Sequence, residues 1–286
     1  MTTRLLALAL SLSVPAASAA SQLARRYAAG DTIGYVMDGL NSEGGRDTIR
    51  YRATAAGIVT RDSTGRYAEQ LTWTHLDRNG SGVPLDPRRA RQTLSLAPEW
   101  QLLPDLRDAA PELIGPMLDL FTYYVDAKLA VAQPSVRSPG DSVLLPLGVG
   151  GSWADGRSVL IGKDAVDFEI KVLSVAGDRA TVQVRHVPPQ ANKLDLPAAW
   201  MNEPVATLPN NWVEVVERTD GHYRARVGAE SFTVELQLSR KDGRLLSATM
   251  QNPVAVVERD CEDRALSVCG PPRRYLISRV IMLQGR

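Results

Sequence analysis

Three histidines, His75, His186 and His222, are the side chains of this chain best suited to bind a metal or transfer a proton. A zinc site needs ligands at fixed local spacings such as H-x-x-x-H or C-x-x-C, and the sequence has none. We therefore expect no metal and no other cofactor. His75 and His186 each end an expected hairpin strand, so a joint site is an alternative to two solvent-facing side chains. Convergence of either one with a carboxylate and a serine in a cleft would favour a hydrolase.

Two further patterns suggest hydrolytic chemistry without specifying it. Gly150-Gly151-Ser152-Trp153 is the nearest match to the G-x-S-x-G motif of α/β-hydrolases, but no helical pattern follows it. Asp155 and Glu203 lie near tryptophans, and sugar-cleaving sites combine paired carboxylates with aromatic platforms. Acids beside tryptophan are common, and no glycine motif for phosphates or dinucleotides is present. We expect a protein that is not an enzyme, with a secreted hydrolase as the alternative.

Aromatic residues in unusual surroundings are the other candidates for function. Trp153, Trp200 and Trp212 lie in or beside segments rich in proline and glycine, and Phe121 and Tyr124 belong to a very apolar segment. Ligand pockets are mostly apolar with few polar groups, so we expect these five residues to bind a ligand. The alternative is that each ring closes one end of the core, as large amphipathic side chains often do.

The two cysteines are Cys261 and Cys269, and the polar segment between them is typical of an exposed turn. Two such thiols pair in an oxidising compartment. Because they are not spaced as C-x-x-C at a helix start, a redox-active pair is disfavoured. We expect a structural disulfide.

The elements that position these candidate residues are expected to be mainly strands, because apolar residues recur at every second position along much of the chain. Asp/Gly turns separate many of the alternating runs, which is typical of antiparallel hairpins. The expected strands cover residues 48–59, 67–76, 168–172, 180–184, 232–238, 245 onward and 278–283. Residues 80–87, 148–156 and 188–209 are expected to be irregular.

Residues 111–131 differ because their apolar positions follow a helical spacing and cover more than one stripe. Pro111 suits a helix start, whereas Pro116 is expected to kink or restart the helix. A helix this apolar is buried on most of its surface. We therefore predict a mainly β protein, a curved antiparallel sheet or half-barrel, packed around one apolar helix at about 111–131.

The halves of the chain share a short motif. Gly30-Asp31-Thr32-Ile33 resembles Gly140-Asp141-Ser142-Val143, and each precedes a long expected hairpin. One interpretation is an internal duplication with halves at about 26–134 and 135–286. We expect a single β-rich domain over residues 20–286, because no linker of low complexity divides it.

Residues 1–19 have the layout of a secretory signal: Arg4, an apolar run over 5–14, and Ala17-Ser18-Ala19 before the cleavage site. The apolar run is shorter than the about 20 residues that span a bilayer, and no later run is long enough. We expect a periplasmic or secreted protein without a transmembrane segment in the mature chain.

The charge of the mature chain is balanced, because the net charge of +1 includes Arg4 of the signal. A nucleic-acid partner is therefore not expected. The basic pair Arg273-Arg274 is interpreted as part of a solvated loop.

Several stretches carry a resemblance to known proteins, among them Tyr27-Ala28-Ala29-Gly30-Asp31-Thr32-Ile33-Gly34-Tyr35, Ser152-Trp153-Ala154-Asp155-Gly156 and Asn210-Asn211-Trp212-Val213. They resemble uncharacterised exported bacterial proteins of β-rich type, a likeness that brings no activity with it. The expected architecture is loosely similar to the half-barrels of periplasmic lipoprotein carriers, which hold acyl chains on a concave apolar face. This likeness is one of fold, and fold alone does not assign function.

These observations favour a non-catalytic envelope protein that binds a hydrophobic ligand or a partner protein. The expected partners are a lipid, an acyl chain or another exported protein. If residues 111–131 fill the concave face of the sheet, the helix is core. If they leave an apolar cavity, the helix lines a ligand site.

Overall fold

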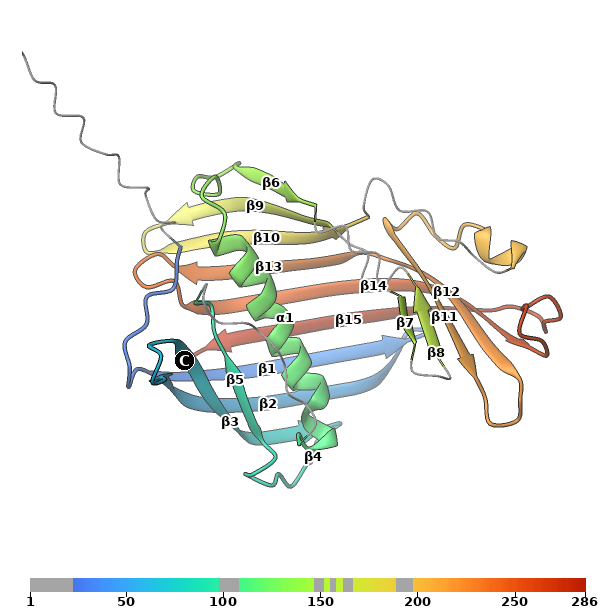
Figure 1. The fold of residues 1–286 in the computed structure, drawn as a ribbon, viewed down its shortest axis with the longest axis horizontal. Coiled ribbons are helices and arrows are strands. Elements are labelled where there is room, and N and C mark those ends of the chain that lie inside the picture. The colour runs from blue at the N-terminus through green and yellow to red at the C-terminus, as the bar shows by residue number, and fades with distance from the viewer. Residues whose placement is uncertain (1–22, 98–107, 147–151, 155–157, 162–166, 189–197) are drawn as a thin grey trace, which may run out of the picture.

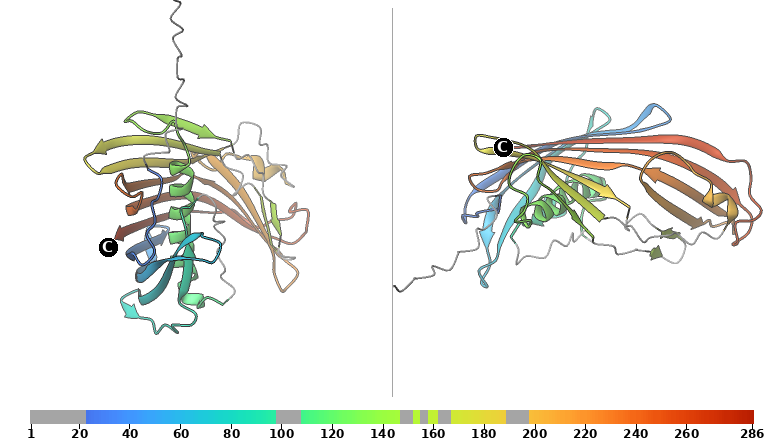
Figure 2. Two further views of the ribbon diagram at one scale, coloured as in Figure 1. Left: turned by 60° about the vertical axis from the view of Figure 1, so that its left-hand side comes forward. Right: turned by 90° about the horizontal axis from the view of Figure 1, so that it is seen from above.

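The computed structural model describes residues 23–97, 108–146, 152–154, 158–161, 167–188 and 198–286. Within these ranges the strands form one open antiparallel sheet, which a single helix crosses on one face (Figure 1). The sheet curves toward the helix, as the view from above shows (Figure 2). The predicted fold class, a mainly β protein with a curved sheet around one apolar helix, is confirmed.

The first strands form a meander along one side of the sheet. They are β1 (Thr32–Glu43), β2 (Arg46–Arg61) and β3 (Tyr67–Arg78), with β4 (Ser81–Gly82) and β5 (Arg91–Leu94) paired along β3. The turn between β2 and β3 is made by Asp62, whose Oδ1 accepts hydrogen bonds from the backbone N–H groups of Thr64 and Arg66 at 2.9 Å each. Gly65 has a φ of +90° in this turn, a conformation that favours glycine.

The remaining strands complete the sheet on the other side of β1. The strands are β6 (Ser142–Leu145), β7 (Ser152–Ala154), β8 (Ser158–Ile161), β9 (Asp167–Ala176), β10 (Arg179–Val187), β11 (Asn210–Glu217), β12 (Tyr223–Glu230), β13 (Phe232–Ser239), β14 (Leu245–Cys261) and β15 (Arg273–Gly285). β14 pairs with β13 along its first part and with β12 along its second. The sheet therefore divides beside β14 into a branch β13-β10-β9-β6 and a branch β12-β11-β8-β7.

β14 shows how differently the two branches are covered. From Ala248 to Asn252 its buried side chains alternate, since only the face toward the helix is covered. From Val254 to Glu258 every residue is buried. Val254 and Val256 pack with Trp212, whereas Val257 lies beside Val227 on the face of Met201 and Leu266. This part of β14 is therefore covered on both faces, which the sequence did not indicate.

The apolar helix begins with a 3-10 turn, η1 (Pro111–Leu113), and continues as α1 (Ile114–Val131). The predicted bounds 111–131 are confirmed. Pro116 is the third residue of α1, where a backbone N–H has no partner within the helix, so it is accommodated in the first turn. α1 continues through Pro116 without interruption, so the restart expected at this residue is wrong. No helix among the described residues is long and apolar enough to cross a membrane.

The two Gly-Asp motifs form turns with matching hydrogen bonds. Gly30 donates to the carbonyl of Val59 at 2.9 Å, and Val59 donates back to Asp31 at 2.8 Å. Gly140 and Asp141 make the same pair of bonds with Val172, both at 2.9 Å. The φ angles of the two glycines are +90° and +92°. The motifs are therefore alike in local structure, while a duplication of the whole halves stays a prediction.

Gly57 in β2 lies where the backbone of β3 comes closest. A Cβ added to Gly57 would lie 1.8 Å from the carbonyl oxygen of Gln70, which is backbone and cannot turn aside. We expect Gly57→Ala to lower the free energy of unfolding by about 1–3 kcal/mol, the usual cost of overpacking. Urea unfolding measures this, with Gly82→Ala as the control because a Cβ there meets no atom within 4 Å. Equal midpoints for the two variants would show that the close approach has no energetic effect.

Candidate functional site

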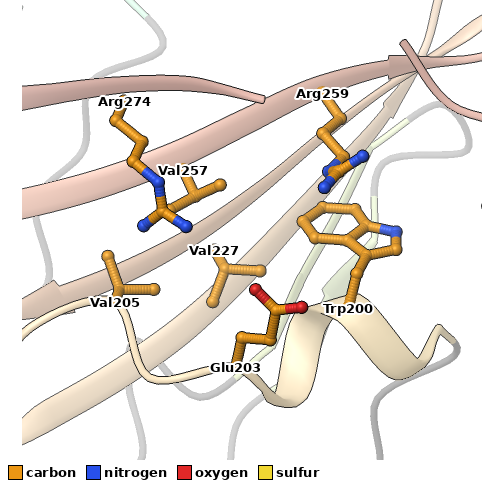
Figure 3. A pocket seen from close by; sticks show the side chains of 7 residues that line it. All are labelled: Trp200, Glu203, Val205, Val227, Val257, Arg259 and Arg274. Atoms are coloured by element: carbon orange, nitrogen blue, oxygen red, sulfur yellow. The ribbon is translucent and has the colours of Figure 1, made fainter. Parts of the chain in front are cut away.

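A small hollow lies where η2 (Ala199–Asn202) packs on the second branch of the sheet (Figure 3). Its free space, including the part open to solvent, is about 260 Å³. The floor is apolar and the rim carries charge. The lining residues are Trp200, Glu203, Val205, Val227, Val257, Arg259 and Arg274.

Strand alternation explains why three of these residues share one face. Val257 and Arg259 are two positions apart in β14, so their side chains point the same way. Arg274 of β15 is the cross-strand partner of Val257 and lies on that face as well. Arg274 is therefore a strand residue beside the hollow, and its interpretation as part of a loop is wrong.

The disulfide loop holds one wall of the hollow. Cys261 and Cys269 are bonded, as predicted. Between them, the carbonyl of Leu266 accepts a hydrogen bond from Trp200 Nε1 at 3.1 Å. Arg259 Nη1 donates to the carbonyl of Gly270, just beyond the loop, at 3.2 Å. The crosslinked segment thus positions both the indole and a guanidinium group.

The charges around the hollow do not balance. Arg259 lies over the Trp200 ring with its Cζ 5.1 Å from the ring centre. The guanidinium groups of Arg259 and Arg274 reach the hollow from one side and Glu203 from the other (Figure 3). Within the described part of the chain neither arginine forms an ion pair, and the buried Nε of Arg259 has no hydrogen-bond acceptor. The hollow thus combines a net positive charge with a free donor.

The other aromatic residues predicted to bind ligand lie elsewhere. Trp212 is stacked over Gly228, its cross-strand partner, and is buried with Val254 and Val256. Its neighbour Val213 points the opposite way, into the cluster that Trp200 borders. Trp200 and Trp212 are therefore on opposite faces of the sheet. Trp153 belongs to β7, but its side chain lies outside the described part of the structure.

Tyr124 and Phe121 both lie on α1 but differ in burial. Tyr124 is fully buried and its hydroxyl is hydrogen-bonded to Glu69 and Tyr35. Phe121 is only half-buried at the edge of the core. The inner face of the helix is thus packed core at Tyr124, which fits a structural role for this side chain.

Glu69 is the centre of a buried polar network beneath the helix. Its carboxylate accepts hydrogen bonds from Tyr35 at 3.1 Å and from Tyr124, and Arg25 Nε lies 3.5 Å away. The Arg25 side chain is completely buried. Burial raises the pKa of the Glu69 carboxyl, and Tyr124, Arg25 and Tyr35 offset part of this rise. Burial also raises the pKa of Tyr27, which stacks with Arg25, to about 12.

A second buried carboxylate joins the helix to a histidine. Asp126 Oδ1 lies 3.5 Å from His186 Nε2, and the His186 ring is stacked on Phe232 with 4.2 Å between ring centres. Asn210 Nδ2 donates to the His186 carbonyl at 2.9 Å. Asp126 Oδ2 is buried without a hydrogen-bond partner in the described part of the chain. The His186 ring therefore meets a carboxylate, and within the described residues its ring neighbours are Asp126, Phe168 and Phe232 rather than a serine.

The remaining sequence candidates do not join this pair. His75 is exposed on β3, and five strands lie between β3 and β10 in the sheet, so the joint site of His75 and His186 is wrong. His222 is exposed in the turn before β12. Asp155 lies outside the described residues, and so does the side chain of Ser152. The described residues contain no group of three side chains that could hold a metal ion.

A line of polar side chains crosses the helix-facing side of the sheet where the branches separate. Arg279 in β15 is the cross-strand partner of both Asn41 and Asn252. Asn252 Nδ2 donates to Glu230 Oε2 at 3.2 Å, and Glu230 is the partner of Asn210 in β11. This line separates the main core from the apolar cluster around Trp212.

The Glu69 network predicts a large effect of removing one charge. Glu69→Gln leaves the Arg25 guanidinium buried without a counter-charge, and we expect a loss of about 3–5 kcal/mol in the free energy of unfolding. Denaturant unfolding at neutral pH measures it. Asp38→Asn, which breaks an exposed pair with Arg52, is the control and should cost less than about 1 kcal/mol. Similar losses in the two variants would contradict the assigned role of Glu69.

Asp126 predicts a pH-dependent contribution to stability. Burial raises the pKa of the Asp126 carboxyl above its ordinary value of 3.8, and His186 offsets part of this rise. Because the folded protein holds this proton more tightly than the unfolded chain, the stabilisation is complete below about pH 4 and is lost as the pH rises through the folded-state pKa. The Asp126→Asn variant should therefore lose less stability than the wild type between about pH 4 and about pH 7. Urea unfolding across this range tests it, with exposed Asp178→Asn as the control. Parallel pH profiles for wild type and Asp126→Asn would rule out the effect.

No protein family model and no curated protein matches the sequence. The function must therefore be inferred from the hollow and the buried networks themselves.

Proposed function

We propose that the protein is a non-catalytic exported envelope protein that binds a hydrophobic ligand, and that the Trp200 hollow receives part of this ligand. The observation that carries the proposal is the apolar floor of the hollow beneath a charged rim. Val205, Val227 and Val257 form this floor, and the indole of Trp200 forms one wall. Ligand sites commonly combine an apolar surface with a few placed polar groups.

The size of the hollow limits what it can hold. The about 260 Å³ of free space includes a part that is open to solvent, so the hollow is a surface depression that does not enclose a whole ligand. It therefore suits one end of an elongated molecule, with the rest of the ligand on the surface. A lipid or an acyl chain has this shape, which agrees with the expected class of partner.

The setting of the hollow supports a role outside the cytoplasm. A disulfide closes the loop whose Leu266 carbonyl accepts a hydrogen bond from Trp200, and disulfides persist in oxidising compartments. The architectural likeness to lipoprotein carriers remains part of the proposal. The hollow lies on the face of the sheet opposite to α1, however, because Arg274 points away from the face on which Arg279 meets the helix residue Asp119. The helix therefore takes no part in the proposed site.

Binding of a fluorescent fatty acid tests the proposal directly. We expect the mature protein to bind it, and Trp200→Ala to weaken binding by about tenfold, which corresponds to ~1.4 kcal/mol. Mass spectrometry of an organic extract of the purified protein should also find a lipid. Leu173→Ala is the matched control, because Leu173 is 37% exposed on β9 in the other branch.

Two outcomes would replace this proposal. Absence of both co-purified lipid and fatty-acid binding would remove it. A secreted hydrolase is the second candidate function, favoured by the pairing of His186 with Asp126. Ester turnover by the same preparation that disappears in His186→Ala, with the thermal melting temperature unchanged, would favour the hydrolase.

A further inference from the structure

We infer that the Trp200 hollow binds the anionic head group of an amphiphile, a carboxylate or phosphate, between Arg259 and Arg274. This inference rests on the proposed function and specifies the chemistry of its ligand. The head group of the ligand then enters the hollow and its apolar chain lies outside. In the alternative, a purely hydrophobic molecule would insert an apolar end into the hollow.

The polar groups of the hollow match an acceptor of hydrogen bonds. Arg259 Nε is buried and donates to no atom of the described residues, and a buried donor without a partner carries a desolvation cost. An anionic oxygen beside it would satisfy this donor and form a charge-assisted bond. Arg274 brings a second guanidinium group to the same space, as Figure 3 shows. Planar guanidinium groups bind carboxylates and phosphates through paired hydrogen bonds.

Electrostatics favour an anion over a neutral head group. Neighbouring arginines on the opposite face are already neutralised: Arg226 pairs with Glu214 and Glu258, and Arg273 pairs with Glu258. Around the hollow, Glu203 is the one carboxylate among the lining residues, opposite two arginines. The hollow thus retains positive charge that the adjacent face does not.

The apolar part of the ligand has a surface to follow. Leu276 is two residues beyond Arg274 in β15 and lies on the same face of that strand. It is 66% exposed, and its cross-strand partner is Ala255. A chain leaving the hollow beside Arg274 would cover Leu276, which gives a favourable burial of apolar area. An inorganic anion alone would leave this surface exposed.

Titration calorimetry with ligands of one chain length tests the inference. The probes are dodecanoate, dodecyl phosphate, the neutral dodecanol, and inorganic phosphate alone. We expect at least one anionic amphiphile to bind about tenfold or more tighter than dodecanol, as expected for charge-assisted hydrogen bonds. Arg259→Gln combined with Arg274→Gln should remove this preference. The better of the two anionic probes identifies the head group as a carboxylate or a phosphate.

Two variants distinguish a binding role from an effect on folding. Glu203→Gln removes the opposing carboxylate, so anionic probes should bind about fivefold tighter, the size of one close charge interaction in water. Arg273→Gln is the matched control, because Arg273 is adjacent in sequence but faces the opposite side and pairs with Glu258. It should leave the preference unchanged.

Each outcome separates the inference from the proposed function. Equal binding of dodecanol and the anionic probes would overturn the inference and leave the proposed function standing. No binding of any amphiphile would overturn both. Binding of inorganic phosphate as tight as that of dodecyl phosphate would also overturn the inference, because the apolar chain would then contribute nothing.

Discussion

Carboxyl groups buried between helix α1 and the sheet constrain the position of the helix. Asp119 pairs with Arg279 and accepts a hydrogen bond from Tyr51 at 2.6 Å, and Asp126 meets His186 two turns later. Glu69 binds Tyr124 from the sheet side. Apolar packing alone would tolerate sliding of so uniformly apolar a helix, whereas each buried charge is satisfied in one register only. These contacts involve β1, β2, β3, β10 and β15, so they fix the helix relative to most of the sheet.

The division of the sheet at β14 gives the molecule two chemically distinct parts. One branch completes the core around the helix, and the other supports the Trp200 hollow. The polar line through Arg279, Asn252 and Glu230 lies at the boundary. Because buried polar groups must keep their partners, this line limits how far the apolar clusters on the helix-facing side can extend. The hollow lies on the opposite face of the sheet, in a small cluster of its own.

Local patterns in the sequence predicted the regular elements well because they depend on neighbours along the chain. Alternation predicted the long strands β2, β3, β9, β10, β13, β14 and β15, and the helix matched its expected bounds. The short strands β4 and β7 lie in segments expected to be irregular, so that expectation is wrong for these residues. The two aspartates of the helix are seven residues apart, which places them on one face; this spacing could have indicated that both point to the sheet. The division of the sheet beside β14 and the burial of both faces of this strand could not be predicted from the sequence. Both depend on which distant segments of the chain become neighbours. The same holds for the hollow, where Trp200 and Glu203 meet Arg259 and Arg274 from distant strands. The disulfide between Cys261 and Cys269 was predicted correctly because the sequence contains only these two cysteines and they lie close together along the chain.

The disulfide loop has a consequence for when the hollow is complete. Trp200 bonds to a carbonyl inside the loop, and Arg259 bonds to the residue that follows it. A chain with reduced thiols lacks the crosslink that holds these two partners together. Binding of the proposed ligand would then depend on oxidation of these two thiols, a reaction that oxidising compartments favour.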